Sequence, residues 1–199
     1  MEKDQLNPHF KVVLIGGSAG SLEVLMKILP KMTGIPNYAL VIILHRKVSE
    51  DNLLEQLFSV KTSVPVKQVE DKTKLTPGFI YVAPSNYHLL FEKQGLLSLD
   101  ISEKVNYSRP SIDVSFESAA DAFGANVTGI LLSGANADGT QGLIAIKEAG
   151  GTVVIQQPAS AEMPYMPDHA LANIAADYVL DPNQILEFLG GDAPNHRHD

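Results

Sequence analysis

The chain has 199 residues, a length that suits one domain with a well-buried core, and its 45% hydrophobic and 19% charged residues are ordinary globular proportions. The formal net charge of −8 disfavours non-specific binding to nucleic acid or anionic membranes, and the lack of cysteine excludes disulfides and thiolate chemistry. No apolar segment resembles a signal peptide or a membrane-spanning helix, so we expect a cytoplasmic protein without membrane insertion.

Short apolar runs rich in β-branched residues predict buried parallel strands, here over residues 11–16, 39–45, 127–133 and 152–156. Helical spacing of apolar residues predicts helices over residues 21–32, 49–58, 111–123 and 139–149. Ser111 suits the N-cap of the third helix, and a pair of glycines ends the fourth. The alternation predicts an α/β fold, a doubly wound, mainly parallel sheet with helices on both faces.

Residues 64–101 differ because their apolar segments are shorter and are separated by turn residues such as Thr76-Pro77-Gly78. We expect extra strands here, including an antiparallel hairpin at one edge of the sheet. Residues 1–189 are expected to form a single domain, and residues 190–199, rich in Gly, Pro and His, are expected to be a disordered tail.

Ser18 lies in the motif Gly16-Gly17-Ser18-Ala19-Gly20, directly after the first predicted strand. The G-x-S-x-G pattern at a strand-to-helix turn is typical of a nucleophile elbow, which raises a serine hydroxyl above the sheet. Glycine suits such a turn because a tight bend can require a positive φ angle. A serine presented this way becomes a nucleophile only where a base and an orienting acid reach it.

Two residues can supply these partners, because they also follow predicted strands. His45 closes the second strand, and Asp138 lies in the loop after the third. Side chains at the carboxyl ends of neighbouring parallel strands meet at one edge of the sheet. Imidazole is suited to take the serine proton, a carboxylate can orient the imidazole, and the backbone N–H groups of Ala19 and Ala135 can stabilise an oxyanion.

Each of these residues also has a simpler interpretation. A glycine-rich turn can cradle a phosphate, a strand-end histidine can be structural, and an Asp-Gly pair often opens a helix. The order Ser, His, Asp differs from that of α/β-hydrolases. No dinucleotide-binding or P-loop motif is present, the histidines show no metal-ligand spacing, and Glu55 is expected on a solvated helix face.

Over residues 11–189 the chain resembles the catalytic domain of the CheB family of chemotaxis protein-glutamate methylesterases. The similarity is carried by short segments in a specific order and spacing. These are Ile15-Gly16-Gly17-Ser18-Ala19-Gly20, Val41-Ile42-Ile43-Leu44-His45, Leu75-Thr76-Pro77-Gly78, Tyr81-Val82-Ala83-Pro84, Arg109-Pro110-Ser111-Ile112-Asp113, Ser133-Gly134-Ala135-Asn136-Ala137-Asp138-Gly139 and Met166-Pro167, together with His88 and Glu70-Asp71.

The resemblance implies Ser18 as nucleophile, His45 as general base and Asp138 as orienting acid. It implies hydrolysis of γ-glutamyl methyl esters on cytoplasmic chemoreceptor helices with release of methanol, and deamidation of receptor glutamines, without metal or cofactor. Family members usually carry an N-terminal receiver domain. Here about ten residues precede the first strand, so we expect constitutive activity or control by a separate regulatory protein.

The chain departs from the family pattern at Ala19, usually threonine, and at Ala135, usually methionine. Substrate identity is therefore less fixed than reaction class. Arg109 can position an acidic receptor helix or form a structural ion pair, and His88 is similarly open. Two other functions stay open, a noncatalytic docking module in a signalling pathway and an esterase for a different ester.

Overall fold

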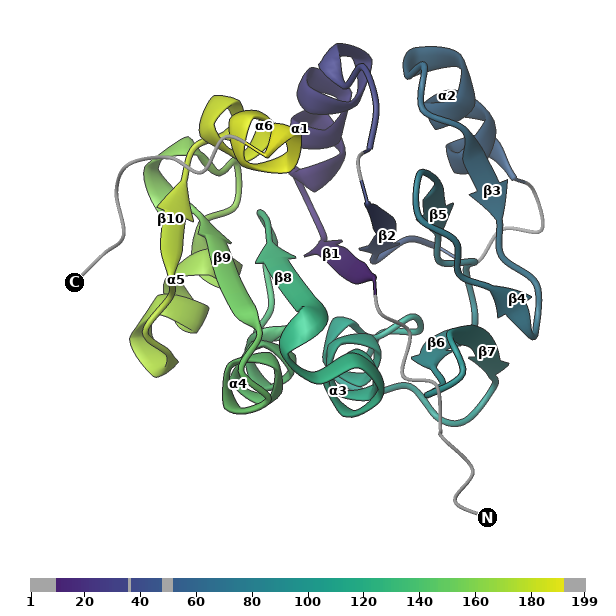
Figure 1. Cartoon of the computed structure of the whole chain (residues 1–199). Helices are drawn as coiled ribbons and strands as arrows, with labels where there is room; N and C mark the ends of the chain where they lie inside the picture. Colours follow the sequence, from purple (N-terminus) through teal and green to yellow (C-terminus); the bar gives the residue numbers. More distant parts are fainter. Residues whose placement is uncertain (1–9, 36, 48–51, 192–199) are drawn as a thin grey trace.

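The structure is a computed structural model that describes residues 10–35, 37–47 and 52–191. Its centre is a seven-stranded, wholly parallel sheet with the strand order β10-β9-β8-β1-β2-β5-β3 (Figure 1). The strands are β1 (Lys11–Gly17), β2 (Tyr38–Leu44), β3 (Val66–Gln68), β5 (Ile80–Val82), β8 (Val127–Leu131), β9 (Thr152–Gln156) and β10 (Tyr178–Leu180). The predicted α/β architecture is therefore confirmed.

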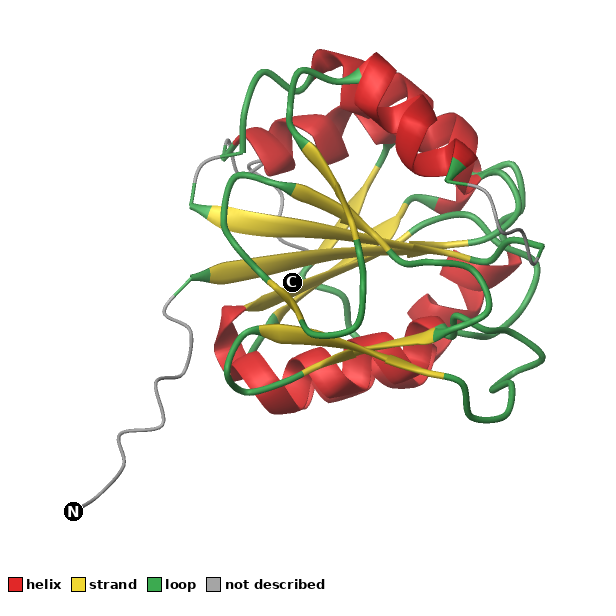
Figure 2. Ribbon diagram, turned by 90° about the vertical axis from the view of Figure 1, so that its right-hand side faces the viewer, coloured by secondary structure: helices red, strands yellow, loops and turns green. Residues whose placement is uncertain are grey.

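Helices cover both faces of this sheet (Figure 2). One layer holds α1 (Ser21–Ile28), α2 (Leu53–Lys61) and α6 (Pro182–Gly190), and the other holds α3 (Ile112–Phe123), α4 (Thr140–Glu148) and α5 (Tyr165–Asn173). Successive side chains of a strand point to opposite faces, so Val12 and Leu14 enter one apolar core while Val13 and Ile15 enter the other. This two-sided burial explains why the strands are continuous apolar runs.

The predicted antiparallel hairpin exists, but it lies in a separate small sheet and not at an edge of the main one. The small sheet has the order β4-β7-β6, with β4 (Thr73–Lys74), β6 (His88–Phe91) and β7 (Leu96–Asp100). It packs against α3, where Ser115 Oγ donates to Leu89 O at 2.9 Å and Phe91 N donates to Ser118 Oγ at 3.1 Å. Burial of Leu89 and Phe91 against α3 draws the hairpin to this face.

Several boundaries differ from the predicted ones. The first helix ends at Ile28 and continues as a 3₁₀ turn over Leu29–Lys31, because Pro30 lacks an amide hydrogen. Helix α2 begins at Leu53, and the predicted start at residues 49–51 lies outside the described residues. Gly190 is the last residue of α6, whereas residues 192–199 of the expected tail are not described.

The strand order reverses between β8 and β1, since the chain builds outward from β1 through β2 and then returns to the other side of β1. In open α/β sheets, ligands bind beyond the carboxyl ends of the strands at such a reversal. Within the described residues, no helix has both the length and the hydropathy to cross a membrane.

Candidate active site

Ser18, His45 and Asp138 come together beyond three adjacent strands, as the sequence predicted. Ser18 follows β1, His45 follows β2, and Asp138 lies in the loop between β8 and α4. Backbone bonds hold these loops in register, since Ser18 N donates to Ser133 O at 2.9 Å and His45 N donates to Gly17 O at 3.0 Å. Ser133 Oγ ties them further by donating to Ala19 O at 2.7 Å and accepting from Met163 N at 2.9 Å.

Glycine is required at two places around Ser18. Gly20 has a φ angle of 82°, so the left-handed conformation of the turn falls on Gly20, and Ser18 itself has no positive φ. A Cβ atom on Gly134 would lie 2.5 Å from Met166 Cε and 3.0 Å from Ser18 Cβ. The absence of a side chain at Gly134 therefore lets the second loop approach the serine.

The carboxylate of Asp138 is fully buried and accepts five hydrogen bonds. His45 Nε2 lies 2.7 Å from Asp138 Oδ2, and the N–H groups of Ile112 and Asp113 donate at 2.7 and 3.0 Å. Ser111 Oγ donates at 3.0 Å and Asn106 Nδ2 at 3.3 Å. The carboxylate of Asp138 thus lies against the N-terminus of α3, where the helix dipole favours negative charge.

Burial acts to raise the pKa of Asp138, but the hydrogen bonds from His45, Ile112 and Asp113 outweigh it and lower the pKa to about 2. Asp138 is therefore ionised at neutral pH, and its carboxylate accepts a hydrogen bond from the N–H group at His45 Nε2. Nδ1 of His45 is then the unprotonated ring nitrogen, whose lone pair can accept a proton.

Asn136, which sequence reasoning did not single out, contacts this second ring nitrogen. Its Oδ1 accepts from Asp138 N at 3.1 Å, so its Nδ2 is the atom that lies 3.4 Å from His45 Nδ1. The backbone bond fixes which end of the amide faces the ring. Hydrogen bonds on both sides of the imidazole therefore select one tautomer. A signal was present, because Asn136 lies two residues before Asp138 in the same loop.

Ser18 is half-buried and lines one hollow together with His45, although its hydroxyl forms no hydrogen bond within the described part of the chain. Catalytic hydrogen bonds of this kind often tighten only when substrate binds. The N–H groups of Ala19 and Ala135 likewise donate to no acceptor among the described residues, so both are free to donate to a ligand.

Asp113 is a second buried carboxyl beside Asp138. Its Oδ1 accepts from Gly142 N at 2.8 Å and its Oδ2 from Asn106 Nδ2 at 3.1 Å. Burial raises the pKa of Asp113 to about 7, with the charge of Asp138 adding to the effect against the Gly142 hydrogen bond. In the sequence, Asp113 stood out only as the last residue of the Arg109-Pro110-Ser111-Ile112-Asp113 segment.

The remaining candidates have structural partners. Arg109 donates to Asn86 Oδ1, to Ile101 O at 2.8 Å and to Ser102 O at 2.6 Å, so its guanidinium holds the loop over residues 101–109. His88 is buried between Glu103 O and Ser111 N. The expectation that Glu55 is solvated is wrong, since it is 7% exposed and pairs with Arg46 at 3.0 Å. Among the described residues, no group of three or more His, Cys, Asp or Glu side chains could hold a metal ion.

The model of one protein family, described as CheB methylesterase, matches residues 13–189. The chain belongs to the CheB methylesterase family. A protein from Leptospira interrogans is 42% identical over 188 residues, which cover 91% of this chain and 94% of that protein. The crystal structure of the Thermotoga maritima CheB methylesterase catalytic domain superposes with a TM-score of 0.85 at 31% identity, and the match covers 90% of this chain and 97% of that one.

Some CheB relatives are about twice as long as the region they share with this chain. A protein-glutamate methylesterase/protein-glutamine glutaminase of Bordetella parapertussis is 34% identical over 181 residues, and the match covers 89% of this chain but 51% of that protein. The CheB resemblance inferred from the sequence is thus confirmed, and so is its extent along the described fold.

Proposed function

We propose that the chain is a serine hydrolase that demethylates γ-glutamyl methyl esters on cytoplasmic chemoreceptor helices, releases methanol, and deamidates glutamine at the same positions. The observation that carries the proposal is the buried, ionised Asp138 bound to His45 beside the exposed end of the Ser18 turn. Membership of the CheB family supports the reaction class.

The proposed reaction begins when Ser18 Oγ attacks the ester carbonyl carbon while His45 Nδ1 accepts the serine proton. Asp138 stabilises the resulting imidazolium through Nε2, and the N–H groups of Ala19 and Ala135 donate to the tetrahedral oxyanion. Collapse breaks the bond to the methoxy oxygen, which leaves as methanol with the proton from His45. Water, deprotonated by His45, then hydrolyses the γ-glutamyl-enzyme. A glutamine substrate follows the same path and releases ammonia.

Methanol release from methylated chemoreceptor cytoplasmic fragments tests this proposal. Ser18→Ala should reduce turnover by several orders of magnitude, because the covalent intermediate cannot form. Ser59→Ala is the matched control, since Ser59 is exposed on α2 and its hydroxyl donates only to Glu55 O one turn earlier. Turnover that Ser18→Ala leaves unchanged would exclude the mechanism.

The two alternatives have their own tests. A noncatalytic docking module would not react with a serine-directed phosphonate probe, whereas we expect the probe to label the wild-type chain and not Ser18→Ala. An esterase for another substrate would hydrolyse small esters and leave receptor methyl esters intact. The buried donors around the Asp138 carboxylate favour an enzyme, because a docking surface has no use for an oriented imidazole.

A further inference from the structure

Two adjoining hollows, one mainly apolar and one basic, share His45, Arg46 and Lys47. The leucine hollow, of about 390 Å³, is lined by Ser18 and His45, by Arg46 and Lys47, and mostly by leucines, namely Leu22, Leu44, Leu53, Leu54 and Leu57. The basic hollow, of about 280 Å³, is formed by His45, Arg46, Lys47, Lys104, Tyr107 and Arg109. A ligand whose reacting group reaches His45 and Ser18 therefore has an apolar wall on one side and a cationic wall on the other.

The apolar wall is formed by leucines of two helices, and these leucines are partly exposed to solvent. Leu22 on α1 is 41% exposed and Leu53 on α2 is 63% exposed. A single exposed leucine is ordinary on a protein surface. Here the leucines of two helices instead line one continuous hollow that ends at the candidate nucleophile, which is a place where a ligand can bury them.

The cationic wall stands out in a chain with a net charge of −8. No acidic side chain from the described part of the chain lines the basic hollow. The ion pairs found among the described residues include neither Lys104 nor Arg109, and the guanidinium of Arg109 is bound only by uncharged oxygens. The positive charge is thus available to an acidic ligand.

A tight turn presents Tyr107 at the rim of the basic hollow. Val105 N donates to Ser108 O at 3.2 Å and Ser108 N donates to Val105 O at 2.9 Å, so Asn106 and Tyr107 take φ angles of 50° and 62°. This left-handed conformation is uncommon for a bulky residue. Asn106 turns inward to Asp113 and Asp138, while Tyr107 is 97% exposed. The inward amide anchors the turn to the site, and the tyrosine ring faces solvent.

We propose that the two hollows form one docking surface for an acidic amphipathic helix, with Leu22, Leu53 and Leu57 against its apolar face and Lys104 and Tyr107 beside its acidic face. The proposal rests on the proposed function and specifies how that substrate is recognised. A helix fits because residues three or four positions apart share a face, so an apolar stripe and a neighbouring acidic stripe can contact both walls at once.

Fluorescence anisotropy with two labelled helical peptides tests this surface apart from catalysis. Both carry methionine at the ester position as an inert stand-in; one has glutamates a turn to either side, and the other has alanines there, which keep the helix and cannot be deamidated. Wild-type chain should bind the acidic peptide more tightly. Lys104→Glu should weaken the acidic peptide about tenfold at low salt and change the neutral peptide far less, because only the first loses a charge contact.

Substitutions on α2 test the apolar wall. Leu53→Gln should weaken both peptides about fivefold, since the lost contact is apolar. Val60→Gln and Lys61→Glu are the matched controls, because Val60 is 83% exposed, Lys61 is also exposed, and neither lines the leucine hollow or the basic hollow. Tyr107→Gly should weaken binding without lowering thermal stability, because glycine adopts the left-handed turn at less cost.

Equal binding of the two peptides, or losses at Lys104 and Leu53 no larger than those of the controls, would overturn the docking surface. A wild-type dimer in sedimentation that Leu53→Gln dissociates would also overturn it, since the leucines would then join two copies. Methanol release from the corresponding methyl-ester peptide is measured separately. Peptide binding with the predicted losses but without methanol release would refute the proposed reaction and leave the docking surface standing.

Discussion

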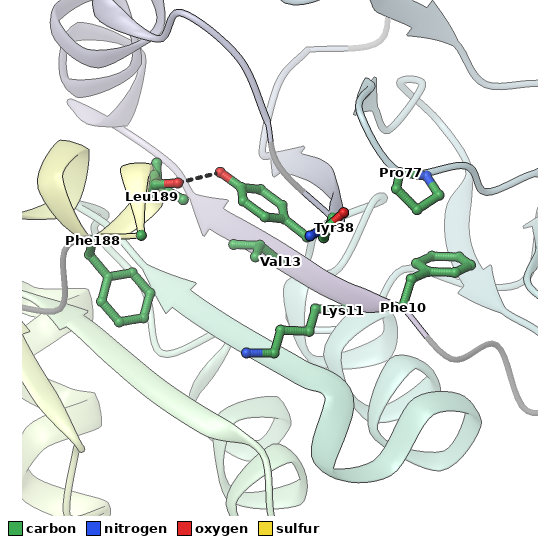
Figure 3. Close-up of a pocket in the computed structure, with 9 residues that line it drawn as sticks. Phe10, Lys11, Val13, Tyr38, Pro77, Phe188 and Leu189 are labelled. Atoms are coloured by element: carbon green, nitrogen blue, oxygen red, sulfur yellow. Dashed lines mark hydrogen bonds between the residues drawn. The ribbon is translucent and has the colours of Figure 1, made fainter.

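The hollows at the two ends of the central sheet differ, and the larger one is not the one that contains the candidate catalytic residues. The larger hollow, of about 680 Å³, lies at the amino ends of β1 and β2 and is lined by Phe10, Lys11, Val13, Tyr38, Pro77 and Phe188 (Figure 3). There the hydroxyl of Tyr38 is already used, because it donates to Leu189 O at 2.8 Å. The smaller hollow at the carboxyl end holds Ser18 and His45.

This difference follows from backbone direction. At the carboxyl ends, strands lead into the N-termini of helices, whose unpaired N–H groups stabilise a buried carboxylate such as Asp138. The amino ends of the strands receive helix C-termini, which offer carbonyl oxygens, as Leu189 O does to Tyr38. Chemistry that needs an ionised acid and free N–H groups is therefore expected at one end only.

The largest expected effect breaks the carboxyl end. Asp138→Asn should lower kcat about 10³–10⁴-fold on a methyl-ester substrate, because an amide no longer holds His45 in the required tautomer. Asp121→Asn is the control, since Asp121 is an exposed carboxylate on α3, away from the Asp138 loop. Circular dichroism at equal concentration checks folding. A loss below tenfold would mean that Asp138 serves the fold and not the reaction.

A second test sharpens the role of the carboxyl pair. The pKa of Asp113 is raised from 3.8 to about 7 in the folded chain, so the folded state holds the proton more tightly than the unfolded state. The contribution of Asp113 to the free energy of unfolding therefore falls as pH rises through this interval. Asp113→Asn removes this fall. Between pH 4 and pH 8, the free energy of unfolding of the variant should therefore rise by roughly 2–4 kcal/mol relative to that of the wild type.

Asp138 acts in the opposite sense, because its pKa of about 2 is below its ordinary value of 3.8. Its contribution to stability is present above pH 3.8 and is lost as pH falls through the folded pKa.

Urea unfolding at pH 4, 6 and 8 measures the Asp113 effect, again with Asp121→Asn as control. An unchanged pH slope in Asp113→Asn would show that Asp113 is ionised throughout.

The smallest expected effect concerns the amino end. Tyr38→Phe should lower the free energy of unfolding by about 1 kcal/mol, because Leu189 O loses its buried donor. Methanol release should stay within twofold of wild type. Tyr165→Phe should change neither quantity, since Tyr165 is 53% exposed and its hydroxyl has no partner among the described residues. A large loss of turnover in Tyr38→Phe would contradict the assignment of chemistry to one end.

The sequence predicted the parts of the molecule whose signals are local. The four buried strands are apolar on both faces, and Ser18, His45 and Asp138 follow three of them, so the sheet topology alone brings these residues together. Helix α6 was missed although its start carries a strong signal, since Asp181 and Gln184 form a capping box with Pro182 between them.

Other features depend on contacts between distant segments. The burial of Glu55 depends on Arg46 Nη2, which lies nine residues earlier in the chain and also donates to Ala83 O. In the sequence Asp113 is an ordinary acid in the first turn of a helix. Its raised pKa depends on burial and on Asp138, and Gly142, which donates to it, lies on the next helix, α4. The placement of the β6–β7 hairpin was likewise decided by α3, which lies after it in the chain.

The bonds of Ser133 have a consequence for how the site fluctuates. Its hydroxyl joins Ala19 O to Met163 N, its carbonyl binds Ser18 N, and Gly134 N donates to Met163 O at 3.0 Å. Hydrogen bonds at Ser133 and its neighbour Gly134 thereby join three loops from separate parts of the chain. They should open to solvent in a single cooperative event, so that the exchange of the amide hydrogens of Ser18 and Gly134 with deuterium reports one shared opening free energy.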